Sequence, residues 1–284
     1  MTDEIDVTKP IELIVLVVKD RAARCRQPNQ QVITLKAAEA YSTVPGLVVS
    51  VNLKKSWQFK GHPYLSGHIA SMRVDAEALG LPPLAVEVVG TWDSTEAYPD
   101  DVENDDNAAI KDRAIKANIA RVPRPSCVVQ QVLPGFDTDE LIAEGNDPIV
   151  EANELREKGA YVEARQLLHD LLAQDLRCLD AHAHLGSMMF TIDPRQALNH
   201  YEVGVKIGEL ALGNSFQGVL SWRDIDNRPF LRCLHGYSLC LWKLERFVKS
   251  VEAFRRILYV ESDGRDGHQF HDTGCVGAAC LYRQ

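Results

Sequence analysis

The spacing of hydrophobic residues changes from alternating to helical about halfway along this chain. In the first half, the β-branched run at residues 11–19 and the alternating stretch at residues 47–53 are typical of strands. Further strands are predicted at residues 31–36, 64–74 and 84–89, separated by turns that contain glycine or proline. Short strands with such turns predict a small antiparallel β barrel or sandwich within residues 1–92.

From residue 146 onward, hydrophobic residues recur at steps of three and four, which is the period of amphipathic helices. Asn146 or Asp147 can cap the first helix, and Pro148 suits its first position. Gly159 is placed to end that helix, because glycine readily adopts the conformation that follows a helix. The sequence therefore predicts an α+β fold in two domains, with the β-rich domain at residues 1–92 and an all-α domain at residues 146–262.

The helical half contains a degenerate internal repeat. Gly159, Ala164 and Leu168 match the turn and second helix of a tetratricopeptide (TPR) unit, whose period is about 34 residues. Two further units show the same residue classes in the same order: Leu185, Gly186, Met189, Ala197, Tyr201 and Gly204, then Leu234, Tyr237, Leu241, Phe247, Ser250 and Phe254. The third unit departs from the pattern at Glu245, which stands where the turn glycine belongs. We therefore expect a TPR-like array of three helical hairpins.

Three longer stretches of the helical half are distinctive: DLRCLDAHAHLG (residues 175–186), HYEVGVKIGELALG (residues 200–213) and IDNRPFLRCLHGYSLCLWKL (residues 225–244). Through these stretches, and through VKDRAARCR and GHPYLSG in the first half, the chain resembles a group of bacterial cytoplasmic TPR-containing proteins whose function is not established. The resemblance implies a β-rich N-terminal domain followed by a short TPR array. It implies no substrate and no catalytic residue. Residues 263–284 depart from it because they lose the helical period, and we expect an irregular tail there.

Charge is distributed unevenly along the chain. The net charge of −9 argues against nucleic-acid binding by the whole surface, although a local basic patch remains compatible with it. Residues 93–112 contain eight acidic residues and one basic residue, and residues 93–145 are predicted to be an acidic, proline-containing linker. An alternative is an acidic arm that covers the basic face of the first domain. Residues 20–75 carry eight basic and three acidic residues, a local charge of +5.

The stretch KKSWQFKGHPY interleaves basic and aromatic residues within the β-rich half. Aromatic rings that stack on bases, beside lysines that contact phosphates, are what single-stranded nucleic acid requires of a small barrel. The candidate surface consists of Lys54, Lys55, Trp57, Lys60 and Tyr64. The alternative is a barrel whose aromatic residues face inward and whose lysines are solvated edge residues.

A second candidate is the polar loop before the third repeat. Asp226 or Asn227 can cap the following helix and Pro229 can begin it, but these roles do not account for the other polar and aromatic residues. We consider a partner-binding site formed by Trp222, Arg223, Asp224, Asp226, Asn227 and Arg228. The alternative is an internal salt-bridge cluster that joins two helical pairs. In the helix itself, Cys233 and Cys240 share a face and are predicted to be core thiols.

The sequence predicts no cofactor and no catalytic residue. It contains no nucleotide-binding glycine motif and no nucleophile elbow. His268, His271, Cys275 and Cys280 form a weak candidate for a zinc site, because their spacing is not that of a common zinc module. The acidic N-terminus does not resemble a secretory signal, and the longest apolar run is too short to cross a bilayer. We therefore expect a cytoplasmic protein with reduced cysteines and no membrane partner.

The sequence leaves three functions open. The first is a non-enzymatic scaffold or adaptor whose TPR-type groove binds a peptide or a helix of another protein, or a second copy of the chain as a homodimer. The second is a nucleic-acid or ribosome-associated adaptor that uses the basic and aromatic β-rich domain. The third is an enzyme of unknown class, for which no group of reactive residues stands out.

Overall fold

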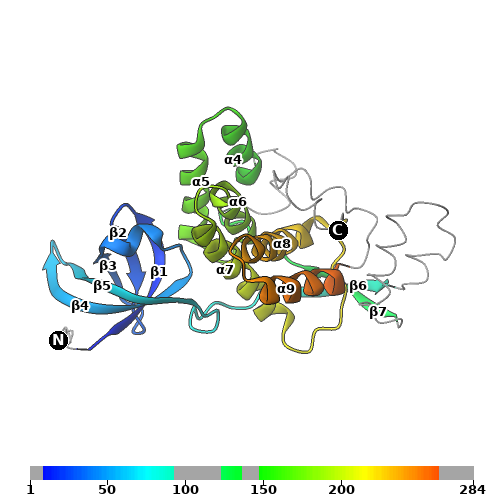
Figure 1. Cartoon of the computed structure of the whole chain (residues 1–284), viewed down its shortest axis with the longest axis horizontal. Coiled ribbons are helices and arrows are strands. Elements are labelled where there is room, and N and C mark those ends of the chain that lie inside the picture. The colour runs from blue at the N-terminus through cyan, green and yellow to red at the C-terminus, as the bar shows by residue number, and fades with distance from the viewer. Residues whose placement is uncertain (1–8, 93–122, 136–146, 262–284) are drawn as a thin grey trace.

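The structure is a computed structural model that describes residues 9–92, 123–135 and 147–261. This part of the chain contains a five-stranded β barrel, a two-stranded sheet and six α-helices. Figure 1 shows the barrel at one end of the molecule, with the helices beside it. The predicted α+β layout is confirmed in that a β barrel precedes a helical half.

The barrel closes in the order β1-β2-β3-β5-β4. Its strands are β1 (Ile11–Lys19), β2 (Ala22–Arg26), β3 (Val32–Lys36), β4 (Leu47–Phe59) and β5 (His62–Val74). All neighbours pair antiparallel except β3 and β5, which are parallel. The prediction of an antiparallel barrel is wrong at this junction. β1 and β3 run in the same direction, because each pairs antiparallel with β2. β4 is antiparallel to β1 and β5 is antiparallel to β4, so β5 runs in the same direction as β3.

Two strands differ from the sequence prediction. β2 is a barrel strand that the sequence did not reveal, because it is short and its buried residues, Ala23 and Cys25, alternate with arginines. The strand predicted at residues 84–89 exists as β6 (Val86–Trp92), but it lies outside the barrel and pairs with β7 (Arg124–Val129). β7 falls within residues 93–145, which were predicted to be a linker, and the structure differs from that prediction here.

The β6–β7 sheet is joined to the helical half through β7. The Cys127 N–H donates to the carbonyl oxygen of Val219 at 2.8 Å, and the Val219 N–H donates to that of Pro125 at 2.8 Å. Arg124 is buried, and its guanidinium donates to three backbone oxygens at 2.7–2.8 Å, those of Gln217, Gly218 and Tyr259. A buried charge needs such hydrogen bonds to offset lost hydration, so Arg124 holds the sheet against the helices.

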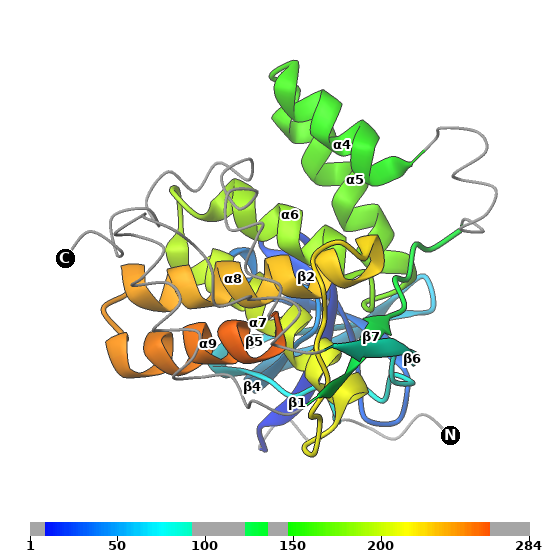
Figure 2. The ribbon, with the colours of Figure 1, turned by 90° about the vertical axis from the view of Figure 1, so that its right-hand side faces the viewer.

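The helical half consists of consecutive pairs. The helices are α4 (Pro148–Glu157), α5 (Tyr161–Gln174), α6 (Leu179–Met189), α7 (Pro194–Leu212), α8 (Arg228–Lys243) and α9 (Phe247–Val260). The Asp147 carboxylate caps α4 as predicted, by accepting from the Ile149 N–H at 2.7 Å. Figure 2 shows α8 and α9 side by side, with α4 and α5 projecting at the other end. None of the described helices is long and apolar enough to cross a membrane.

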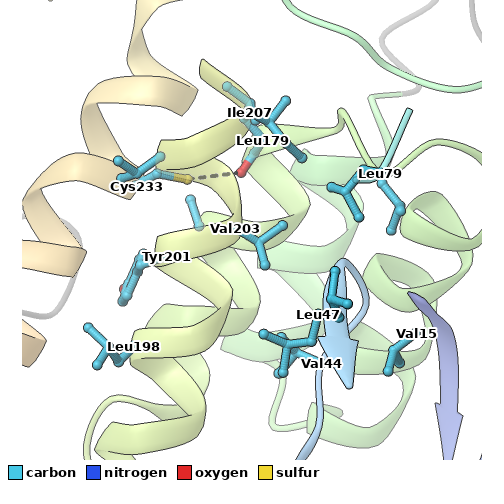
Figure 3. Packing of buried hydrophobic residues seen from close by; sticks show 14 of the residues in the cluster. Val15, Val44, Leu47, Leu79, Leu179, Leu198, Tyr201, Val203, Ile207 and Cys233 are labelled. Atoms are coloured by element: carbon cyan, nitrogen blue, oxygen red, sulfur yellow. Dashed lines mark hydrogen bonds between the residues drawn. The ribbon is translucent and has the colours of Figure 1, made fainter. Parts of the chain in front are cut away.

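The barrel and the helices share one hydrophobic core. Val44, three residues before β4, and Leu47, its first residue, face Val203 of α7 across the junction (Figure 3). Gly46 has a φ of +90°, and a Cβ atom there would lie 2.6 Å from a methyl group of Val203. The close approach therefore requires glycine. Nearby, the Gln196 side chain donates to the Tyr41 carbonyl oxygen at 3.2 Å, which connects α7 to the 3-10 helix η1 (Ala38–Ser42).

Candidate nucleic-acid interface

Trp57 and Tyr64 form a stacked aromatic pair on the outer face of the barrel. They are register partners on β4 and β5, with ring centroids 5.5 Å apart and planes inclined by 13°. Leu65, next to Tyr64 along β5, is fully buried, so Tyr64 faces away from the barrel interior. His62 meets the Tyr64 ring edge-on at 5.0 Å, and its Nε2 lies 2.9 Å from the Thr34 hydroxyl. The pair is thus held in place by neighbours on β3 and β5.

A β-bulge in β4 determines the direction of Trp57. Before the bulge, residues of odd number face the barrel interior, and Val51 is fully buried. The pairing register shifts between Leu53 and Lys55, so that Lys54 is an extra residue. An extra residue reverses the faces of all the residues that follow. Lys55 and Trp57 therefore lie on the outer face, although the alternation of 47–53 would direct them inward.

Two rows of side chains cross the outer face of the barrel. Strand register places Arg24, Thr34, Tyr64 and Trp57 in one row, and Ala22, Lys36, Ser66 and Lys55 in the next. The two rows are about 7 Å apart, because each residue of a strand advances about 3.3 Å. An aromatic row thus lies directly beside a row that carries two lysines.

Lysine side chains surround the aromatic pair. The Lys36 ammonium lies 5.8 Å from the Trp57 ring centroid and 5.6 Å from that of Tyr64. The Lys55 ammonium lies 5.7 Å from the Trp57 centroid. These distances allow a cation–π attraction, which keeps positive charge next to the rings. Lys60 lies over Phe59 instead, at the end of the hairpin.

A shallow depression of about 500 Å³ opens beside the lysine row. It is lined by Arg21, Lys36, Ala37, Ala38, Glu39, Lys54, Ser66, Gly67 and His68. Its carboxylate, Glu39, is paired with His68. A hydrogen bond from its own backbone N–H, supported by His68, lowers the pKa of Glu39 below its ordinary value. Within the described part of the chain, no ion pair neutralises the lining side chains of Arg21, Lys36 and Lys54. The side chains that line the depression therefore carry a net positive charge.

The structure brings together Lys54, Lys55, Trp57 and Tyr64, four of the five residues of the predicted nucleic-acid surface, and places Lys60 farther along the hairpin. It adds Lys36, Arg21 and Arg24. The sequence shows these three as bases, but nothing in it reveals that closure of the barrel sets β2 and β3 beside β5. Nucleic-acid binding by this surface itself remains a prediction.

The loop at residues 222–228 forms a joint between β7 and the helices. Trp222 and Asn227 are buried. The Asn227 amide accepts from the Val129 N–H at 2.9 Å and donates to the carbonyl oxygens of Cys127 and Ser221 at 3.0 and 3.1 Å. These hydrogen bonds join the loop to β7, and the alternative of a salt-bridge cluster stays a prediction.

The rest of this candidate site is partly accessible. The Arg228 side chain donates to the Trp222 carbonyl oxygen at 2.9 Å and lies 5.7 Å from the Trp222 ring. Arg223 is exposed, whereas Asp224 and Asp226 are half-buried. A partner at this loop would therefore contact Arg223 and the two aspartates, while Trp222 and Asn227 serve the internal packing. Partner binding here stays a prediction.

Three histidines meet in the interior between α5, α6 and α7. The ring of His200 lies 5.8 Å from that of His182 and 6.1 Å from that of His169. Burial lowers the pKa of His182 to about 3 and that of His169 to about 4, and it holds the pKa of His200 well below its ordinary value. These rings are therefore neutral at pH 7. His182 is completely buried and packs in the core.

Metal and thiol chemistry has little support in the described residues. No three His, Cys, Asp or Glu side chains in the described ranges are placed to hold a metal ion. The candidate zinc ligands His268, His271, Cys275 and Cys280 lie outside the described residues. Cys233 and Cys240 are fully buried, as predicted for core thiols. Burial raises the pKa of Cys25 and Cys178 to about 12, which keeps these thiols protonated and unreactive.

Comparison of this chain with protein-family models, curated proteins and solved structures finds no match.

Proposed function

We propose that this protein binds single-stranded nucleic acid on the outer face of β3, β5 and β4. The observation that carries the proposal is the outward-facing Trp57–Tyr64 pair with the ammonium groups of Lys36 and Lys55 beside it. A base that stacks on such a ring contributes about 1–3 kcal/mol, and its phosphate is then close to the lysines. A duplex cannot offer the faces of its paired bases, so this surface favours single strands.

The charge distribution supports this proposal. The chain as a whole has a net charge of −9, but residues 20–75 carry +5, and the basic side chains of Arg21, Lys36, Lys54 and Lys55 lie at or beside the aromatic face. The affinity for nucleic acid should decrease with salt, because bound phosphates release their counterions. The slope of log affinity against log salt should be proportional to the number of phosphates contacted. Stacking accepts any base, and the proposed binding therefore has little sequence preference.

Fluorescence anisotropy with a labelled oligouridylate tests this function. Trp57→Ala and Tyr64→Ala should each weaken binding at least about fivefold, because one stacking contact is lost. The matched control is Tyr161→Ala, which removes a tyrosine that is 60% exposed on α5, far along the chain from this face. If the wild-type protein binds no RNA or DNA at low salt, or if Trp57→Ala binds as tightly as the wild type, the proposal is wrong.

We also propose that the helical half is a TPR-like array that contacts protein. Its support is the glycine-mediated packing of consecutive hairpins: a Cβ atom on Gly186 or on Gly236 would lie 2.7 Å or 2.2 Å from the ring of Tyr201. Such close approach of three helices is typical of the small and large positions of TPR units. With the barrel as reader of nucleic acid, the protein would act as an adaptor.

Exposed apolar side chains near the turn between α8 and α9 favour a protein partner. They are those of Trp242, Phe247, Val248 and Val251, which are 39%, 54%, 75% and 49% exposed. Exposed apolar residues that gather on one surface often mark an interface. The molar mass of the wild type and of Phe247→Glu, measured by light scattering over a range of concentrations, tests a homodimer. A dimer that this substitution dissociates supports it; a wild-type monomer throughout excludes it.

A further inference from the structure

We infer that the depression beside the aromatic pair is a phosphate subsite. It receives the phosphate joined to a nucleotide whose base stacks on Trp57 and Tyr64. The inference rests on the proposed single-stranded nucleic-acid function and names a part of the same site. It is carried by three cationic side chains that converge from separate segments: Arg21 from the β1–β2 turn, Lys36 from the end of β3, and Lys54 from the bulge of β4.

The charges of the depression are those of an anion site. Within the described ranges, none of its three cationic side chains forms an ion pair, and its carboxylate, that of Glu39, is engaged by His68. Like charges gathered on one surface repel each other, and a bound anion relieves this repulsion. A phosphate group offers several oxygens to lysine and arginine donors at once. The depression is shallow and open, which suits a group that belongs to a longer strand.

The bulge places two neighbouring lysines at this site. In a regular strand, Lys54 and Lys55 would point to opposite faces. Because Lys54 is the extra residue, it lines the depression while Lys55 lies against Trp57. A Cβ atom on Gly67 would lie 2.3 Å from the Asn52 carbonyl oxygen, so glycine permits the close approach of the two strands at the bulge. Bulges commonly redirect a side chain beside a functional site.

Lys36 connects the depression to the aromatic pair. Its side chain lines the depression, and its ammonium lies within 5.8 Å of both ring centroids. The aromatic row and the lysine row are about 7 Å apart, a distance that the sugar of one nucleotide spans. A base on the rings and its own phosphate in the depression can therefore be bound together.

The salt dependence of oligouridylate binding tests the subsite. Lys54→Ala and Arg21→Ala should each reduce the magnitude of the slope of log affinity against log salt by about 0.7, and each should weaken binding about fivefold at 0.1 M salt. Lys54→Ala keeps the extra residue, so the quenching of Trp57 fluorescence at saturation should be unchanged. The control is Lys19→Ala, which removes an exposed lysine at the end of β1 that does not line the depression.

The outcomes separate the subsite from the function on which it rests. If Lys54→Ala and Arg21→Ala keep the wild-type slope while Trp57→Ala loses binding, the function stands and the subsite is overturned. If the wild type binds no oligonucleotide, the function fails, and a titration with pyrophosphate, followed by the NMR signals of the His68 ring, decides the subsite. A saturable shift that Lys54→Ala abolishes supports it, and the absence of a shift overturns it.

The same assay identifies the source of the phosphate. Oligouridylates with a 5′-phosphate, a 3′-phosphate or neither are compared on the wild type and on Lys54→Ala. A gain in affinity from a terminal phosphate that is lost in Lys54→Ala assigns the subsite to a phosphomonoester. Equal affinity for the three probes, with the loss in Lys54→Ala retained, assigns it to an internal diester. An effect of Lys54→Ala no larger than that of Lys19→Ala with every probe overturns the inference.

Discussion

His182 should make this protein less stable as the pH falls from 8 to 5. Its ring is completely buried on α6, beside the ring of His200, and burial lowers its pKa to about 3. In the unfolded chain the same imidazole has a pKa near 6.5. Between these two values the unfolded state binds a proton that the folded state does not, and the free energy of unfolding falls as the pH is lowered. The stabilising contribution is complete above about pH 6.5.

The loss of unfolding free energy at pH 5 depends almost entirely on protonation of His182 in the unfolded state. Because His182 is still neutral in the folded protein at pH 5, the loss corresponds to the 1.5 pH units below 6.5, or about 2 kcal/mol. His169 and His200 lie near this ring, and Arg165 acts on His200. His169, whose pKa burial lowers to about 4, is also mostly neutral at pH 5 in the folded protein. His200, whose pKa burial also lowers, should add a loss in the same direction.

Urea unfolding at several pH values between 8 and 5 measures this effect. We expect the free energy of unfolding of His182→Leu to fall by about 2 kcal/mol less than that of the wild type over this range. The difference between variant and wild type is the informative quantity, because other groups also titrate. Glu202, whose pKa burial raises, acts in the opposite direction. The control is Ile207→Val, a buried substitution that costs about 1 kcal/mol at every pH and leaves the profile parallel to the wild type.

A His182→Leu profile parallel to that of the wild type between pH 8 and 5 would contradict this prediction. It would mean that the ring takes up its proton in the folded state without cost, and that burial of His182 does not control its charge. A profile of Ile207→Val that is steeper or flatter than the wild type would show that general destabilisation changes the slope, and that the comparison cannot be assigned to His182.

Two further substitutions test the joints of the fold. Asn227→Ala should lower the free energy of unfolding by about 3 kcal/mol, since it leaves the Val129 N–H and two carbonyl groups without their partner. The control is Asp226→Ala, at a half-buried neighbour, which should lower this free energy much less. Equal effects of the two substitutions in urea unfolding would contradict the role of Asn227 as the joint between the loop and β7. Gly46→Ala should destabilise the contact between the barrel and α7 by at least about 1 kcal/mol, because a Cβ atom meets Val203 and the residue has a positive φ. Gly80 also has a positive φ, but no atom lies near its Cβ position. Thermal unfolding of Gly80→Ala therefore measures the backbone strain alone, and the larger loss in Gly46→Ala measures the clash.

Local patterns along the sequence are sufficient for much of the secondary structure. The helix at Pro148 could be predicted because its cap, its proline and its apolar period all lie within one short segment. The alternation at 47–53 predicts a strand for the same reason. The patterns were insufficient for β2, whose five residues are too few to show a clear period, and for the position of β6, because the pairing of β6 with β7 joins segments far apart in the chain.

The loop at residues 222–228 shows the same limit. Its sequence provides a proline at the start of α8, and the polar residues before it are compatible with either a joint or a partner site. The partners of Asn227 on β7 are 98 and 100 residues away. No local pattern reveals such partners, and tertiary packing alone determined that this side chain faces inward.

By itself, the sequence determined that this protein has a strand-rich half with a basic and aromatic segment and a helical half with a repeated pattern, because each property depends on residues close together in the chain. It left open whether Trp57 faces the barrel interior or the solvent. The tertiary structure decided this through the extra residue Lys54, which reverses the faces of β4 beyond Leu53. Closure of the barrel then brought Lys36 and Arg21 beside that face, since strand neighbours are set by long-range pairing.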